Sequence, residues 1–198
     1  LRAAVLVLRA WLTLWRGDIQ INIPNLFAIG FIFTFVHGGL TGLFLGNVTV
    51  DLPLSDTYFV VGHFHMVMGV SPILVVFGAI YHWYPKISGR MWNERLGKAH
   101  FWLTFLGTYA IYLPMHYLGI LGVPRRYYAL GETEFLPQSV HTINAAITIA
   151  ALVVAGSVVI FLYNMIVSLW KGQKASSNPW KATTLEWQTP DTPPKHGN

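Results

Sequence analysis

The chain contains no cysteine, and charged residues make up only 11% of its 198 positions. Without thiols it can form no disulfide, no thiolate metal ligand and no cysteine nucleophile. So few charges, together with 54% hydrophobic and 15% aromatic residues, fall outside the range of soluble domains. The composition therefore predicts a membrane protein.

Four apolar runs are long enough to cross a hydrocarbon core, which needs about 20 helical residues. They cover roughly residues 25–50, 57–84, 100–121 and 139–170. We expect an all-α fold, a polytopic bundle of transmembrane helices with four full spans. A fifth run, residues 1–15, is too short to span. Because it starts without methionine or a polar leader, we interpret it as a truncated helix and the chain as the C-terminal part of a longer subunit.

We expect residues 1–170 to form the membrane part and residues 171–198 an extended cytoplasmic tail without a core of its own. The net charge of +5 does not indicate nucleic acid, because the basic residues are scattered between apolar runs. Alternating the spans puts nearly all of them on one side, and the positive-inside rule makes that side cytoplasmic. They are Arg16, Lys86, Arg90, Arg95, Lys98, Lys171, Lys174, Lys181 and Lys195. The C-terminus would then be cytoplasmic in a bacterial-type or organellar inner membrane.

His63 and His65 lie well inside the second run, about 9 to 12 Å below the start of a helix. Two residues along a helix turn a side chain by about 200°, so the imidazoles would point in opposite directions and could not share one metal. A strand would put them on one face, but the length of the run favours a helix. A metal or haem iron on each side is one interpretation, and hydrogen bonds to neighbouring helices are the other. We interpret the histidines near predicted helix ends as structural, namely His82, His100, His116 and His141.

Arg125 and Arg126 lie on the side that is otherwise poor in positive charge. Paired guanidinium groups suit carboxylates, phosphates or lipid headgroups. Asp56 lies on the same side, at the end of a predicted loop over residues 51–56. It could hold a hard cation through its oxygens, or it or Ser55 could cap the histidine helix. That helix is expected to stop at Pro85.

Four glycines, Gly38, Gly39, Gly42 and Gly46, mark the far half of the first full span. Small residues at such spacing let another helix approach the backbone closely. A flat ligand could use the same opening. Helix packing and ligand binding both remain open from the sequence.

Several motifs together resemble subunit I of haem-copper oxidases of the cytochrome c oxidase kind. In chain order they are Gly38-Gly-Leu-Thr-Gly42, Asp56-Thr-Tyr58, His63-Phe-His65, Gly122-Val-Pro-Arg-Arg-Tyr127 and Thr183-Thr-Leu-Glu-Trp187. They cover nearly the whole chain in the order of the family. The resemblance implies a segment from the end of the eighth helix to the twelfth of a twelve-helix subunit.

The resemblance also implies roles for the candidate site residues. His63 would be the catalytic ligand, binding the high-spin haem where dioxygen is reduced, and His65 would bind the low-spin haem. Arg125 and Arg126 would contact haem propionates, and Asp56 would help to hold magnesium. The copper of the reactive centre would be bound by residues of earlier helices, which are absent from this chain.

The function implied is that of a terminal respiratory oxidase, with electron transfer from the low-spin haem to the haem-copper centre, reduction of dioxygen to water and coupled proton translocation. Its partners would be the N-terminal part of subunit I, other oxidase subunits, a donor such as cytochrome c, and the bilayer. Two positions depart from the family pattern. Ser55 replaces a frequent histidine ligand of magnesium, and Val7 lies near the place of a proton-conducting lysine. A nitric oxide reductase of the same superfamily and a non-catalytic membrane scaffold are the alternatives.

Overall fold

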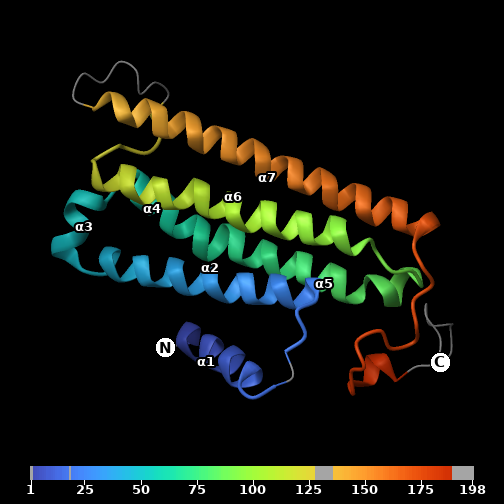
Figure 1. Ribbon diagram of the computed structural model, residues 1–198. Coiled ribbons are helices and arrows are strands. Elements are labelled where there is room, and N and C mark those ends of the chain that lie inside the picture. Colours follow the sequence, from blue (N-terminus) through green and yellow to red (C-terminus); the bar gives the residue numbers. More distant parts are fainter. Residues whose placement is uncertain (1, 18, 128–135, 189–198) are drawn as a thin grey trace.

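The computed structural model describes residues 2–17, 19–127 and 136–188, and this part of the chain consists of helices and loops without a β-strand (Figure 1). The all-α prediction is therefore confirmed. The elements are α1 (Arg2–Leu14), α2 (Ile23–Leu45), α3 (Val48–Leu54), α4 (Tyr58–Phe64), the π-helix η1 (His65–Val70), α5 (Ser71–Ser88), α6 (Glu94–Ile120), α7 (Gln138–Lys171) and the short 3₁₀-helix η2 (Leu185–Trp187).

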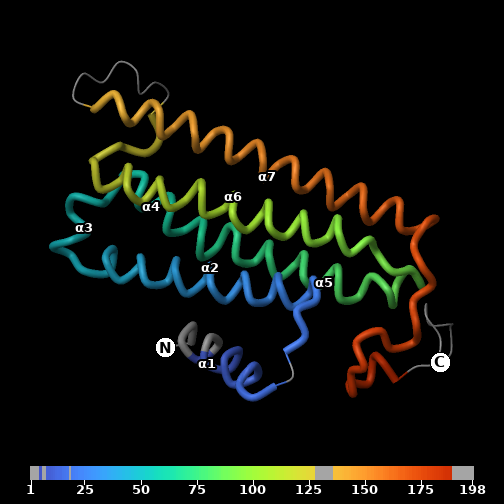
Figure 2. Tube along the Cα trace, in the orientation of Figure 1, coloured from blue at the N-terminus to red at the C-terminus, as the bar shows by residue number. Residues whose placement is uncertain are grey.

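The long helices lie side by side in a bundle (Figures 1 and 2). The continuous helix made of α4, η1 and α5 runs between α2 and α6, and α7 packs along α6. The short α1 lies beside α2, apart from the rest of the bundle. Because α4 contacts both α2 and α6, side chains on its two faces meet different neighbours.

Three of the described helical segments are long and apolar enough to cross a membrane: Ile23–Leu45, Tyr58–Ser88 and Gln138–Lys171. The fourth predicted span belongs to α6, which has 27 residues. It is long enough, but it does not match the apolar character of the other three. Its polar side chains turn inwards, where His100, Thr104, Thr108 and His116 are buried. Burial in the bundle separates these groups from lipid.

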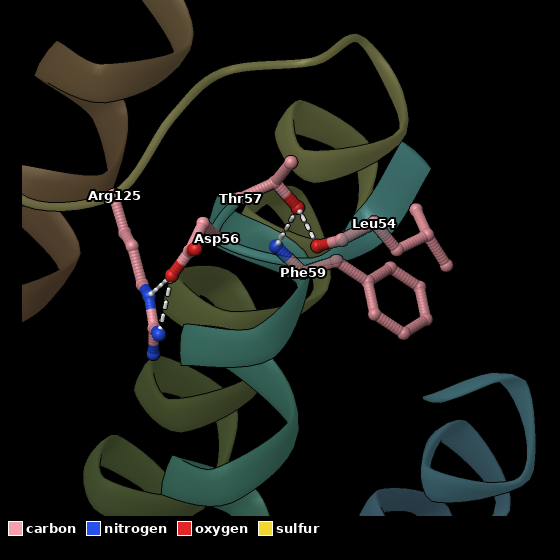
Figure 3. A network of polar contacts seen from close by, with 5 residues as sticks. All are labelled: Leu54, Asp56, Thr57, Phe59 and Arg125. Carbon is pink, nitrogen blue, oxygen red and sulfur yellow. Dashed lines mark hydrogen bonds and ion pairs between the residues drawn. The ribbon is translucent and has the colours of Figure 1, made fainter. Parts of the chain in front are cut away.

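Two expected boundaries at the α3 end of the bundle differ from the structure. The first span was expected to reach residue 50 and to be followed by a loop, but α2 ends at Leu45 and α3 is a separate helix. Asn47 begins α3, because its side chain accepts a hydrogen bond from the backbone N–H of Thr49. The histidine helix is capped by Thr57, which accepts from the N–H of Phe59, and not by Ser55 or Asp56 (Figure 3).

The histidine helix also continues beyond the predicted stop at Pro85 and ends at Ser88. Proline is tolerated in membrane helices where neighbours satisfy the freed backbone groups, and here Gly89, at a φ of 69°, closes the helix. Its middle turn is a π-helix that begins at His65. Pro72 follows this turn and has no N–H to donate, which favours the wider turn before it. The Ser71 hydroxyl donates to the carbonyl of Met66 there.

Residues 172–188 fold back over the end of α5 (Figure 1). We expected an extended tail without a core of its own, and little of this segment is helical. Its tryptophans nevertheless pack: the Nε1–H of Trp180 donates to the carbonyl of His82, and that of Trp187 to its Nε2. Each indole combines a large apolar surface with a polar N–H, and together these hold the segment against α5. Residues 189–198, including Lys195, lie outside the described part.

Candidate functional site

The imidazole of His63 lies against the glycine-containing half of α2. Its Nδ1 is 2.8 Å from the carbonyl oxygen of Gly38 and 3.1 Å from the hydroxyl of Thr41. Because a carbonyl oxygen only accepts, Nδ1 must carry the hydrogen and donate it. The ring edge lies directly over Gly42, where a Cβ would come within 2.7 Å of Cε1 of His63. Helix α2 therefore fixes both the position and the tautomer of this ring.

The imidazole of His65 lies on the other side of the same helix, against α6. Its Nδ1 is 2.9 Å from the carbonyl oxygen of Val61, so this nitrogen also donates its hydrogen. Tyr112 of α6 stacks on the ring, with 5.2 Å between the ring centroids and 17° between the planes. A Cβ at Gly69 would lie 3.3 Å from Cδ2 of His65, so a glycine there leaves room for the ring.

The two rings therefore meet different helices, as the helical spacing predicted, and separate metals for the two rings stay a prediction. Neither Nε2 atom has a hydrogen-bond partner among the residues that the structure describes. With the hydrogen on Nδ1, each Nε2 carries the lone pair, which is the form of imidazole that binds a metal. Both rings thus fit the axial ligation of a haem iron, one on each side of the helix. The carbonyl acceptors are the outer partners that orient such ligands.

Two of the four glycines singled out in the sequence, Gly38 and Gly42, serve helix packing. A Cβ at Gly38 would come within 2.9 Å of side-chain atoms of Val67 and Met66, and the one at Gly42 would meet His63. A Cβ at Gly39 would meet nothing within 4 Å. Close approach of the histidine helix is thus the reason for glycine at positions 38 and 42.

Asp56 and Arg125 come together at the α3 end of the bundle (Figure 3). The guanidinium donates to Oδ1 of Asp56 from Nε at 2.9 Å and from Nη2 at 2.5 Å. The backbone N–H of Arg125 also donates to the carbonyl of Asp56, at 2.8 Å. The loop after α6 is therefore tied to the start of the histidine helix. This contact brings the predicted arginine motif to the end where that helix begins.

Arg126 is exposed and has a positive φ of 69°. Among the described residues it has no hydrogen-bond or ion-pair partner. The structure thus separates the two arginines: Arg125 is held by a carboxylate, and Arg126 is free of such a contact in the described part.

The expected magnesium site has one carboxylate in place. Asp56 is exposed, at 76% of its side-chain surface. The described part of the chain contains no group of three or more His, Cys, Asp or Glu side chains that could hold a metal ion. Ser55, the position that departs from the family pattern, ends α3 instead. Among the described residues, Asp56 is thus not part of a cluster of three such side chains.

Sequence reasoning missed the residues that hold the two imidazoles. Thr41 belongs to the glycine motif, and Gly42 was singled out for close approach, so the sequence did indicate a close contact at these positions. Tyr112 had none, because only tertiary packing puts it over His65. The side chain of Val7, the position of the missing lysine, lies outside the described part.

Three of the four histidines interpreted as structural, His82, His100 and His116, bond neighbouring groups among the described residues. Nδ1 of His100 is 3.1 Å from the hydroxyl of Tyr81. His82 accepts a hydrogen bond from Trp187. Nδ1 of His116 donates to the carbonyl of Tyr112 at 2.6 Å. Each ring thus bonds a neighbouring group within the bundle or at its end.

Comparison with known proteins identifies relatives along most of the chain. The chain is 67% identical over 187 residues to the alternative cytochrome c oxidase subunit 1 of Bradyrhizobium diazoefficiens. The match covers 94% of this chain and 32% of that protein. The chain is 49% identical over 181 residues to cytochrome c oxidase subunit 1 of a Synechocystis species, covering 91% and 32%. The chain thus spans about a third of the length of these relatives.

A solved structure of a heme-copper terminal oxidase dimer shares the fold. It matches with a TM-score of 0.66 at 20% identity, covering 81% of this chain and 28% of that chain. A family model described as cytochrome c and quinol oxidase polypeptide I matches residues 3–153, a range that includes both histidines, Asp56 and both arginines. The chain therefore belongs to the family of cytochrome c and quinol oxidase polypeptide I.

Proposed function

We propose that this chain is the haem-holding C-terminal part of subunit I of a terminal respiratory oxidase that reduces dioxygen to water. His63 would hold a high-spin haem at the oxygen-reducing centre, and His65 would hold a low-spin haem. Two haems supply the electron transfer and the redox chemistry when they are bound. Copper is held by residues outside this chain.

The protein's own contribution is to hold two imidazoles in fixed positions. Helix α2 fixes His63 through a carbonyl acceptor and a glycine contact, and α6 fixes His65 through a stacked ring. Because both ligands belong to one continuous helix, the spacing of their backbone positions is fixed. In a cofactor enzyme the protein holds the cofactor in a fixed geometry and tunes the cofactor's electronic properties.

At the α3 end of the bundle, Arg125 and Arg126 bind the haem propionates, and Asp56 contributes to a magnesium site. The ion pair between Asp56 and Arg125 supports a shared charged network rather than independent groups. Guanidinium groups suit carboxylates, and Arg126, which has no ion-pair partner among the described residues, offers a second one. The exposed carboxylate of Asp56 retains free oxygen positions for a cation.

The partners follow from the share of the relatives that the chain covers. We propose that the N-terminal part of subunit I, further oxidase subunits and an electron donor such as cytochrome c complete the enzyme, and that proton translocation is coupled to it. The many exposed apolar side chains on α2 and α7 are consistent with such partners and with lipid. The C-terminus is cytoplasmic by the bias of basic residues. The relatives' names support dioxygen over nitric oxide as the substrate.

The single observation that supports this proposal best is the pair of opposed imidazoles with their Nδ1 atoms bonded to carbonyls. A non-catalytic scaffold does not need, on each face of one helix, an imidazole whose Nε2 has no hydrogen-bond partner among the described residues. The test uses the complete oxidase complex, purified with His63→Ala and His65→Ala in separate preparations. Optical difference spectra of the reduced enzyme, with and without carbon monoxide, resolve the low-spin and high-spin haems.

We expect His65→Ala to remove the low-spin bands and His63→Ala to remove carbon monoxide binding. His82→Ala, at the far end of the same helix, is the matched control and should keep both haems. Unchanged low-spin bands in His65→Ala would contradict the assignment. Metal analysis of the wild-type complex distinguishes the nitric oxide reductase, because iron without copper would exclude an oxidase.

A further inference from the structure

Tyr112 is the side chain of α6 that lies flat against the ring of His65. The 17° angle between the planes and the 5.2 Å centroid distance describe an offset stack. The Tyr112 hydroxyl has no hydrogen-bond partner among the described residues, so its contact with His65 is made by the ring and not by the oxygen. The neighbouring Phe64 ring also lies near His65, at 4.4 Å between centroids.

The turn of α6 that carries Tyr112 is fixed against the histidine helix by a second contact. Nδ1 of His116, one turn later, donates to the carbonyl of Tyr112 at 2.6 Å. The His116 ring lies directly over Gly62, where a Cβ would come within 2.8 Å of it. His116 is buried and also packs on Phe59 of α4. Since α4 cannot slide along α6 without meeting this ring, the position of Tyr112 relative to His65 is fixed.

We propose that Tyr112 is a positioning residue for His65 and sets the plane of this imidazole toward the low-spin haem. This inference rests on the proposed function. The hydrogen bond from Nδ1 to the carbonyl of Val61 still lets the His65 ring rotate about that bond. The stacked ring of Tyr112 restricts this rotation. The orientation and basicity of an axial imidazole are among the ways in which a protein tunes a haem. Tyr112 would therefore act on the reduction potential through the orientation of His65.

The experiment compares Tyr112→Leu, Tyr112→Phe and Tyr109→Leu in the complete oxidase. Tyr109 is the matched control, because it lies on the same helix and packs on His37 and Phe105 rather than on His65. The measurements are haem content, the EPR spectrum of the oxidised low-spin haem and its reduction potential. EPR anisotropy reports the orientation of axial imidazoles, and a change in packing elsewhere does not move it.

We expect Tyr112→Leu to retain the low-spin haem, to shift its EPR spectrum and to change its reduction equilibrium about tenfold, which is about 59 mV for a one-electron couple. Tyr112→Phe should match the wild type, because it keeps the ring. Tyr109→Leu should also match it. If Tyr112→Leu does not assemble, Tyr112→Met, which also lacks a ring, takes its place.

Two outcomes would overturn the proposal. An EPR spectrum and a potential of Tyr112→Leu that equal those of Tyr109→Leu would show that the stack does not position His65. A shift in Tyr112→Phe as large as that in Tyr112→Leu would place the effect in the hydroxyl. Failure of the proposed function is distinct, because a low-spin haem would then persist in His65→Ala.

Discussion

Replacing Gly42 with alanine places a methyl group directly against His63. The added Cβ would lie 2.7 Å from Cε1 and 3.4 Å from Nε2 of the ring. To restore a contact of 3.4 Å at Cε1, the ring must move by about 0.7 Å. Such a shift lengthens the 2.8 Å hydrogen bond from Nδ1 to the carbonyl of Gly38 to at most about 3.5 Å, which weakens it. Overpacking of this kind costs about 1–3 kcal/mol.

Gly39→Ala is the matched control on the same helix, because a Cβ there meets nothing within 4 Å. Alanine favours a helix over glycine by about 1 kcal/mol, so this variant should be as stable as the wild type or more so. Gly42→Ala should lower the melting temperature and reduce carbon monoxide binding at the high-spin haem. Its oxidase activity should fall about 10-fold to 100-fold. The assays are thermal denaturation and difference spectra of the complete oxidase. If Gly42→Ala behaves as Gly39→Ala does, the close contact with His63 has no role in holding it.

Three further variants test other contacts by thermal denaturation of the complete complex. Asn164→Ala should lower the free energy of unfolding by about 2–4 kcal/mol, because the buried amide forms hydrogen bonds with both the N–H and the carbonyl of Asn93. A decrease below about 1 kcal/mol would contradict this. Trp187→Phe should cost about 1 kcal/mol by removing the N–H that donates to His82, and proteolysis should cut the tail faster. Asp56→Asn should lower the free energy of unfolding by less than about 1 kcal/mol, because the carboxylate of the ion pair is largely exposed. A larger decrease would show that the ion pair contributes more to stability than an exposed pair does.

The sequence predicted the helices well where apolar runs are long and uninterrupted. Their boundaries were less accurate where polar side chains compete for backbone groups. Asn47 starts a helix in a segment expected to form a loop, and Thr57 rather than its neighbours caps the next one. Pro85 was expected to end a helix that continues for three more residues. In each case a local hydrogen bond or a packed neighbour determined the outcome, and periodicity does not record either.

The candidate site was predictable in part for the same reason. The helical rotation between His63 and His65 follows from the backbone geometry alone, so their opposed directions could be predicted. Their partners could not, because the carbonyl of Gly38 and the ring of Tyr112 are distant in sequence. The pairing of Asp56 with Arg125 was missed as well, since the sequence placed both at one end of the bundle without showing that they touch.

The sequence by itself determined the membrane class, the helical fold and two imidazoles on opposite faces of one helix. These follow from apolar length and helical periodicity, which are local properties of the chain. Only the tertiary structure decided which helix each imidazole meets, which tautomer His63 adopts and which arginine is held by a carboxylate. Those outcomes depend on close approach between segments far apart in the chain, which the order of residues does not specify.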